Sequence, residues 1–273
     1  MASFTVGLCQ VGAAPGESAA SFRRRVSESM DRAGDANCYV LPELVACTRH
    51  WTAGSTARDL VLDEAEADDY CEFLAGEADE RNAVVVGGSY YAETSDDIRN
   101  RCVVAVPGEG VATYDKAHPI PSERTAGVAA SEHVAPVVEH GGVKVGVAVC
   151  YDVEFPEFVR EAVDRGAEVL AVPSWTGARA GYERVRRCAA ARAVENQAYV
   201  AAVPLVAPAA DVDATGRSAV YGPCDGLVGP DGTRLTLPAD EDAAASCTVD
   251  MDALRESREA ADVRPYTDAT EVF

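Results

Sequence analysis

Cys150 stands where an apolar run gives way to acidic residues and a proline. The run 143–149 is rich in valine and is typical of a buried strand, while Pro156 suits the first turn of a helix, where its missing N–H costs nothing. Cys150 is therefore expected in the turn between strand and helix. Unpaired N–H groups at a helix start favour a reactive thiolate and any oxyanion formed nearby. A buried structural thiol is the alternative, because cysteine is among the residues most often buried.

Lysine is nearly absent from a chain that uses arginine freely: of 24 basic residues, only Lys116 and Lys144 are lysines. Lys144 alternates with valines in the run before Cys150, which suits a surface-facing position. Lys116 follows the apolar segment 103–106 and the turn 107–110, a pattern that predicts a hairpin with Lys116 at a strand end. An ammonium is a compact point charge that can stand beside a thiolate and an oxyanion, unlike a broad guanidinium.

Glu43 closes another apolar segment. Residues 37–44 read as a short buried strand that ends in Pro42 and Glu43. A carboxylate at the end of a buried element has a partner or a function. A loop carboxylate or a helix N-cap is the structural alternative, since carboxylates usually lie at the surface.

Together these segments resemble the carbon–nitrogen hydrolase family, also called the nitrilase superfamily. The words LPE at 41–43, YDK at 114–116 and VCYD at 149–152 agree with the family in order and separation. Further matching words are FTVGLCQ at 4–10, EFPE at 154–157, GAEVL at 166–170, VPS at 172–174, ARAVENQ at 191–197 and GPDG at 229–232. The resemblance implies a four-layer α-β-β-α sandwich of the nitrilase type in a single domain over 1–273. It also implies no cofactor and a homodimer or higher homo-oligomer.

The resemblance further implies roles for these residues. Cys150 would attack a carbonyl-type carbon, with Glu43 as the general base that takes the thiol proton and passes it to the leaving nitrogen. Hydrolysis of the resulting thioester would complete the reaction. Lys116 and the backbone N–H of Tyr151 would hold the oxyanion of the tetrahedral intermediates. Lys116 would also keep Glu43 ionised and lower the pKa of the thiol, while burial would push both pKa values the other way.

Many family members carry a second glutamate, after the lysine, that orients the substrate. Glu123, in the word PSER at 121–124, is similar to one branch of the family, and Glu132 is the competing candidate. The structural alternative for Glu123 is a surface position in a helix capped by Ser122.

A basic cluster runs against the acidic composition. It lies in the segment 176–196, which reads as a loop followed by a long helix, and comprises Arg179, Arg184, Arg186, Arg187 and Arg192. Solvated helix faces with acidic neighbours are the default interpretation, since exposed charge runs rarely bind anything specific. The functional alternative is that Arg179, which falls in the predicted loop, meets a carboxylate on the substrate.

The formal charge of the chain is -21, and its 45 acidic residues are spread along the sequence. Together with the scarcity of lysine, this predicts an origin in a salt-adapted organism, because a densely carboxylated surface stays hydrated in salt and its self-repulsion is screened. The same surface argues against nucleic acid or an anionic membrane as a partner, since phosphates need a basic face.

Nine cysteines are scattered without a Cys-x-x-Cys pair, which favours reduced core residues over a disulfide framework. The four histidines show no metal-ligand spacing, so no metal is expected. His118, two residues from Lys116, could support the site or simply pack in a loop. The sequence has neither a stretch of ~20 apolar residues nor a leader pattern, and a cytoplasmic protein is expected.

Periodicity predicts strands near 4–9, 38–41, 84–89, 101–106, 143–149, 169–172, 199–203, 220–227 and 247–249. Helices with the apolar spacing suited to covering a sheet are predicted at 20–33, 65–82, 156–165 and 182–197. Strands mixed with helices over 273 residues indicate a layered α/β fold.

These observations predict hydrolysis of a non-peptide C–N bond in a small amide-like molecule through a cysteine thioester, releasing ammonia or an amine. Cys-Tyr-Asp after the nucleophile strand resembles amidase-type members, whereas nitrilases more often carry Cys-Trp-Glu. An N-carbamoyl hydrolase or a nitrilase would share the same triad. The alternative from another class is a catalytically idle binding or regulatory protein on the same fold, which the intact Glu43, Lys116 and Cys150 speak against.

Overall fold

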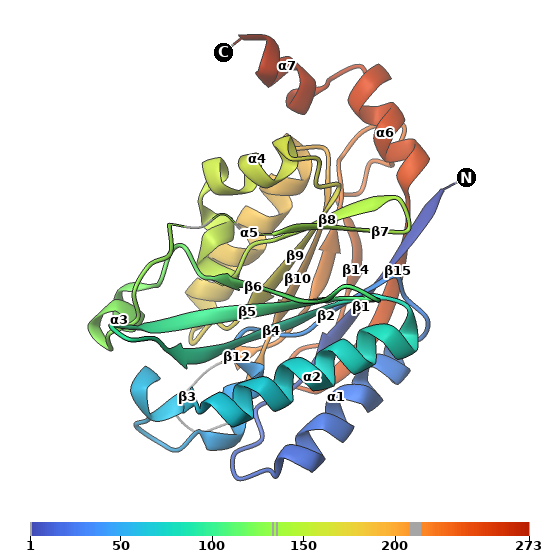
Figure 1. Ribbon diagram of the computed structural model, residues 1–273. Helices are drawn as coiled ribbons and strands as arrows, with labels where there is room; N and C mark the ends of the chain where they lie inside the picture. Colours follow the sequence, from blue (N-terminus) through green and yellow to red (C-terminus); the bar gives the residue numbers. More distant parts are fainter. Residues whose placement is uncertain (1, 133, 135, 208–213, 273) are drawn as a thin grey trace.

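Two mixed β-sheets lie face to face, and helices cover the outer side of each (Figure 1). The computed structural model describes residues 2–132, 134, 136–207 and 214–272, except for the side chains of 270–272. This arrangement is the α-β-β-α sandwich expected from the sequence, so the predicted fold class is confirmed. The expected domain bounds, 1–273, stay a prediction.

The first sheet has the strand order β15-β1-β2-β4-β5-β6, with β3 paired to β4. Its strands are β1 (Ser3–Gln10), β2 (Cys38–Val40), β3 (Val61–Leu62), β4 (Val84–Glu93), β5 (Ile98–Val106), β6 (Gly110–Asp115) and β15 (Ala243–Asp250). Helices α1 (Ala19–Ala33) and α2 (Glu64–Arg81) cover its outer face (Figure 1). Val84 and Val86 join the core shared with the second sheet, whereas Val85 joins the core under the helices, as the two-residue period of a strand requires.

The second sheet has the order β14-β13-β10-β9-β8-β7. Its strands are β7 (Val137–His140), β8 (Val143–Val147), β9 (Val169–Ser174), β10 (Tyr199–Pro204), β13 (Ala219–Tyr221) and β14 (Thr233–Thr236). Helices α4 (Pro156–Asp164) and α5 (Arg179–Glu195) pack on its outer face. The short strands β11 (Val206–Ala207) and β12 (Ala214–Thr215) pair with each other, and α6 (Met251–Ala260) and α7 (Pro265–Val272) follow β15.

The loops at one end of the sheets carry short helices: η1 (Val45–His50), η2 (Ala57–Leu60), α3 (Pro121–Thr125) and η3 (Cys150–Glu154). Strands β1, β2 and β4 run parallel to one another, as do β8, β9 and β10. The segments after β2, β8 and β9 therefore leave from carboxyl ends of parallel strands, which is where α/β folds place their sites.

Three local predictions were wrong. The strand expected at 220–227 ends at Tyr221, because Pro223 lacks an N–H and the Asp225 carboxylate accepts the N–H groups of the next turn. The half-exposed edge strands β7 and β14 were missed because they lack apolar alternation. Helix α5 begins at Arg179, which is therefore helical and does not lie in a loop. No helix among the described residues has the length and apolar character needed to cross a bilayer.

Candidate active site

Glu43 is held by a tight crossing between the end of β2 and a bulge in β4. At Gly88 of β4 the φ angle is +66°, and a Cβ there would lie 1.9 Å from the carbonyl oxygen of Pro42. Leu44 takes a left-handed conformation, with φ of 56°, and its N–H donates to Ser89 Oγ at 3.0 Å. Only glycine lets the two backbones approach this closely, and the crossing turns Glu43 into the interior.

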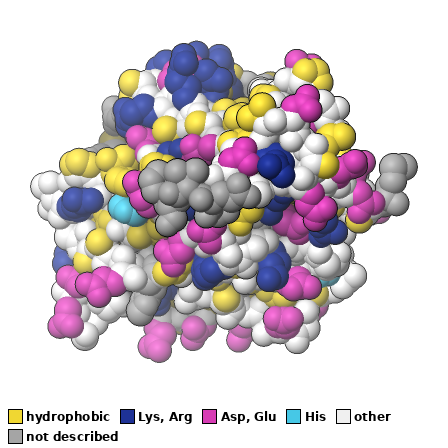
Figure 2. All heavy atoms as spheres, turned by 90° about the horizontal axis from the view of Figure 1, so that it is seen from above, with side chains coloured by type: hydrophobic (Ala, Val, Ile, Leu, Met, Phe, Trp, Pro, Cys, Tyr) yellow, Lys and Arg dark blue, Asp and Glu magenta, His cyan; other side chains and the backbone are white. Residues whose placement is uncertain are grey.

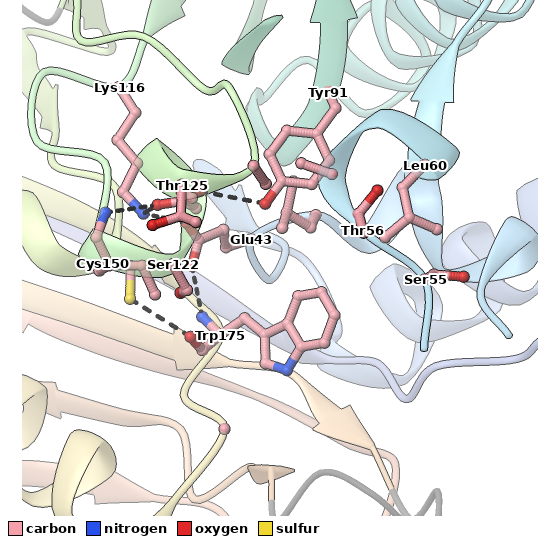
Figure 3. Close-up of a pocket in the computed structure, with 16 residues that line it drawn as sticks. Glu43, Ser55, Thr56, Leu60, Tyr91, Lys116, Ser122, Thr125, Cys150 and Trp175 are labelled. Carbon is pink, nitrogen blue, oxygen red and sulfur yellow. Dashed lines mark hydrogen bonds and ion pairs between the residues drawn. The ribbon is translucent and has the colours of Figure 1, made fainter. Parts of the chain in front are cut away.

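Lys116 lies directly after β6 and is fixed at both ends. Its backbone N–H donates to the carbonyl of Asn100 at 2.8 Å. Its ammonium donates to Glu43 Oε1 at 2.7 Å and to Glu123 Oε2 at 2.9 Å (Figure 3). The Asn100 amide donates to the same two carboxylates, at 3.0 Å and 2.8 Å. One ammonium and one amide therefore hold two buried carboxylates in a closed cluster.

Glu123 is the second glutamate that the structure brings to the ammonium. The Glu123 carboxylate also accepts the backbone N–H of Ile120 at 2.8 Å and the Tyr91 hydroxyl at 3.3 Å. It is 7% exposed, so the surface interpretation does not hold. The N-cap position of α3 is Ile120, whose side chain makes no cap hydrogen bond, so Ser122 does not cap the helix. Glu132, the competing candidate, is exposed and does not line the pocket.

Cys150 begins the turn η3 after β8, in a left-handed conformation with φ of 48°. Such backbone costs about 1–3 kcal/mol for a residue other than glycine and is concentrated at functional sites. The Cys150 thiol donates to the carbonyl of Trp175 at 3.6 Å, and the N–H of Trp175 donates to Glu43 Oε2 at 2.8 Å. The Cys150 thiol and the Glu43 carboxylate are thus linked through the backbone of Trp175, the residue directly after β9. Cys150 lies in the turn between strand β8 and helix α4, as expected, but α4 begins only at Pro156, so the thiol does not sit at the start of that helix.

Burial dominates the electrostatics of this cluster. It raises the pKa of the Cys150 thiol well above its ordinary value, and the charge of Glu43 raises it further, so the pKa-lowering effect expected of Lys116 is outweighed. Burial also raises the pKa of Glu43 against the opposing charge of Lys116. For Glu123, burial is overcome by the Lys116 charge and by hydrogen bonds, and its pKa is lowered. The carboxylate suited to accept a proton is therefore Glu43, while Glu123 stays ionised.

The charges of the two glutamates act in turn on Lys116. Burial would lower the pKa of its ammonium, but the charges of Glu43 and Glu123 outweigh burial and raise the pKa well above its ordinary value. Lys116 is therefore charged throughout the neutral range.

Asp152 links the residues on either side of Lys116 to the turn η3, which begins with Cys150. The side chain of Asp152 is fully buried and accepts the Tyr114 hydroxyl at 3.0 Å. It also accepts the backbone N–H of His118 at 2.9 Å and contacts the His118 Nδ1 at 2.8 Å. The two segments come from different sheets, so Asp152 and His118 join the halves of the site from outside the pocket.

The site opens into a pocket of about 520 Å³ (Figure 3). Its depth holds the charged cluster and Cys150. Apolar side chains form much of its wall: Leu44, Leu60, Tyr91, Ile120 and Trp175. Hydroxyl groups accompany them: Ser55, Thr56, Ser122 and Thr125. The indole of Trp175 rests against that of Trp51, with ring centroids 4.9 Å apart, which fixes one wall.

The arginine cluster lies outside this pocket. The Arg179 side chain is 55% exposed, and its guanidinium bonds to Glu183 at 2.8 Å on the wall of a different cavity of about 310 Å³. Arg184 and Arg187 are likewise exposed and paired with acidic residues, which agrees with the default interpretation. Arg192 differs, because it is buried and donates to backbone carbonyls of η3. On the face that Figure 2 shows, acidic side chains are widely spread, and basic ones form a cluster at the upper edge with others scattered among the acidic ones.

Several residues of the site were not singled out from the sequence. Asn100, Tyr91 and Trp175 come from β5, β4 and the end of β9, and none belongs to a word that signals chemistry. Asp152 was visible only as part of the word VCYD. Among the described residues, no group of three or more histidine, cysteine or acidic side chains is arranged to hold a metal ion. The cysteines, all described, are free.

Comparison with known proteins assigns the chain to a family. The family model for carbon-nitrogen hydrolases matches residues 5–258. The chain therefore belongs to the carbon–nitrogen hydrolase family, as its sequence words predicted, and is a hydrolase of C–N bonds by family.

Individual relatives agree with this assignment. The probable hydrolase YhcX of Bacillus subtilis is 31% identical over 74% of this chain, but the match spans only 40% of that longer protein. Omega-amidase NIT2 of Xenopus tropicalis is 30% identical over 72% of this chain and 75% of its own length. The solved structure of a mutant of the Nesterenkonia AN1 amidase, from the nitrilase superfamily, superposes with a TM-score of 0.69 at 26% identity, covering 94% of both chains.

Proposed function

We propose that this protein hydrolyses the C–N bond of a small amide through a thioester on Cys150. The observation that carries the proposal is the link from the Cys150 thiol through Trp175 to Glu43, beside an ammonium held by two carboxylates. The relatives named as amidases support an amide as the substrate. A pocket of about 520 Å³ suits a small molecule.

In the first half-reaction the Cys150 sulfur bonds to the carbonyl carbon while Glu43 takes the thiol proton. This transfer suits the resting state, because the raised pKa of the thiol keeps it protonated until a base removes the proton. Lys116 and the backbone N–H of Tyr151 stabilise the oxyanion. The C–N bond then breaks, and Glu43 returns the proton to the leaving nitrogen, which departs as ammonia or an amine.

In the second half-reaction water replaces the amine. Glu43 accepts a proton from water as the water oxygen attacks the thioester carbon. The C–S bond breaks, the acid leaves, and the sulfur recovers its proton. Glu123 does not move a proton in this scheme, because its lowered pKa keeps it ionised to orient the ammonium of Lys116 and the substrate nitrogen.

A panel of amides, carbamoyl compounds and nitriles tests the proposal by ammonia release in molar salt. Amides are expected to release ammonia, and mass spectrometry of a quenched reaction is expected to find the acyl group on Cys150. Cys150→Ala should abolish turnover with the fold retained, since it removes only a small volume. If no compound of the panel is turned over, the alternative of a catalytically idle binding protein is favoured. If only carbamoyl compounds or nitriles are turned over, the substrate is not an amide and the proposed substrate class is wrong.

The remaining expectations are carried forward as proposals. We expect at least a homodimer, no nucleic-acid or membrane partner, and a cytoplasmic location. Sedimentation of the full chain in molar salt tests the first expectation: a monomer at every concentration would contradict it.

A further inference from the structure

The pocket beside Cys150 carries an excess of negative charge. Glu43 and Glu123 contribute two carboxylates, and Lys116 is the single cation among the described residues that line it. The Lys116 ammonium already donates to both carboxylates. Its third N–H is the one that the proposed reaction needs for the oxyanion. Lys116 therefore has no donor left for a second anion at the far end of a substrate.

Three arginines lie within two residues, in the sequence, of residues that line the pocket, but none of the three lines the pocket itself. Arg58 pairs with Glu93 at 3.5 Å, and both side chains are exposed. Arg124 is exposed, its Nε donates to the carbonyl of Pro119 at 2.8 Å, and it does not line the pocket. Arg179 pairs with Glu183. The positions that the structure does not describe include neither lysine nor arginine, so no further strong cation is available from them.

The walls that an acyl chain would meet are uncharged. Tyr91 and Trp175 line the space beyond Cys150, and Thr56 and Leu60 lie farther from the thiol (Figure 3). Apolar walls with a few hydroxyl groups suit a neutral chain that is apolar or weakly polar at its far end.

Resting on the amide hydrolysis proposed above, we propose that this pocket selects uncharged amides and rejects those whose acyl chain ends in a carboxylate. A terminal carboxylate would enter a partly desolvated pocket that already holds an excess negative charge. Repulsion and loss of hydration both oppose its binding, and no cation compensates for them. The selection acts on binding and on the transition state alike, because the carboxylate takes no part in the chemistry.

The first test is independent of turnover. 2-Hydroxyethyl and 2-sulfonatoethyl methanethiosulfonate both form a mixed disulfide with a thiol and release methanesulfinate, and they differ in charge two carbons from the sulfur. Rates at Cys150 and at the exposed Cys224 are followed by peptide mass spectrometry. The preference for the neutral reagent is expected to be roughly tenfold greater at Cys150 than at Cys224. Equal preferences at the two cysteines would overturn the proposal.

The second test compares glutaramide with glutaramate, which have nearly the same shape, at pH 8. The diamide has two equivalent amide groups, so a ratio of two in kcat/KM is expected without any selection. We expect glutaramide to be favoured by roughly tenfold or more beyond that ratio. If glutaramate is hydrolysed as well as glutaramide, the substrate class is wrong while amide hydrolysis stands. If neither releases ammonia but the reagent contrast at Cys150 persists, amide hydrolysis fails and the charge selection stands.

A variant at the pocket wall completes the test. Ser122→Arg adds a cation at an exposed position, and Ser122→Gln is the neutral control. Ser122→Arg is expected to reduce the contrast between the neutral and anionic reagents at Cys150 by roughly threefold or more relative to Ser122→Gln. Identical contrasts in the two variants would show that charge does not set the preference and would overturn the proposal.

Discussion

Replacing Lys116 with methionine removes the charge of the buried cluster while keeping a side chain of similar length. The Lys116 side chain is 2% exposed and its ammonium donates to Glu43 and Glu123, so the variant leaves two buried carboxylates without their common cation. Loss of one partner from a buried ion pair costs about 3–5 kcal/mol. The hydrogen bonds from Asn100 and from the backbone of Trp175 remain and keep the cost in this range.

The pH dependence of this loss follows from the sign of the pKa shifts. In the native chain Lys116 helps to lower the pKa of Glu123, and a lowered pKa contributes stability above the unfolded value that is lost as pH falls. Burial already raises the pKa of Glu43 in the native chain, and without Lys116 burial and mutual repulsion raise it further while the lowering of the Glu123 pKa by Lys116 is lost. A raised pKa penalises the fold at high pH and the penalty disappears as pH falls. The stability gap between variant and native chain should therefore close by roughly 1.4 kcal/mol per pH unit for one bound proton.

Urea unfolding in molar salt at pH 8 and pH 5.5 measures this gap. Lys144→Met is the matched control, because it removes the same charge from an exposed position on β8. We expect a loss of several kcal/mol for Lys116→Met at pH 8, less at pH 5.5, and a small, pH-independent loss for Lys144→Met. A Lys116→Met loss that equals the control, or that does not shrink at pH 5.5, would refute the account of the cluster.

Three further predictions concern activity and salt. Lys116→Arg should abolish most turnover, because the planar guanidinium misplaces the N–H donor that binds the oxyanion, whereas Lys144→Arg should leave the rate nearly unchanged. Near-normal rates of both variants on a confirmed amide would contradict the oxyanion role of Lys116. Asp152→Asn should cost about 1–3 kcal/mol of unfolding free energy and lower kcat at least tenfold by loosening Tyr114, while Glu154→Gln should keep the rate. Thermal unfolding should shift to lower temperature as salt is diluted from molar levels to ~0.1 M, where the Debye length reaches about 10 Å; an unchanged midpoint would contradict salt adaptation.

Sequence alone predicted most of the elements that carry the chemistry. The strand before Cys150, the hairpin before Lys116 and the strand before Glu43 are all present, because each depends on the alternation of a few adjacent residues. The layered fold could be predicted from the family resemblance, because the matching motifs are short local segments that occur in a fixed order along the chain. Edge strands such as β14 escaped prediction because half-exposed positions accept residues of either polarity.

The tertiary structure decided which groups meet and how they titrate. Asn100, near the start of β5, reaches Glu43 only because β4 alone separates β5 from β2 in the first sheet, and Trp175 reaches it because β9 of the second sheet ends beside this site. No spacing in the chain encodes these contacts. The choice of Glu123 over Glu132 and the exclusion of Arg179 likewise depend on where α3 and α5 pack. Whether burial or the charge of Lys116 would dominate at the Cys150 thiol was also decided by the structure, where burial wins and the pKa is raised. Desolvation sums over every neighbour in space, and most of those neighbours are distant in the sequence.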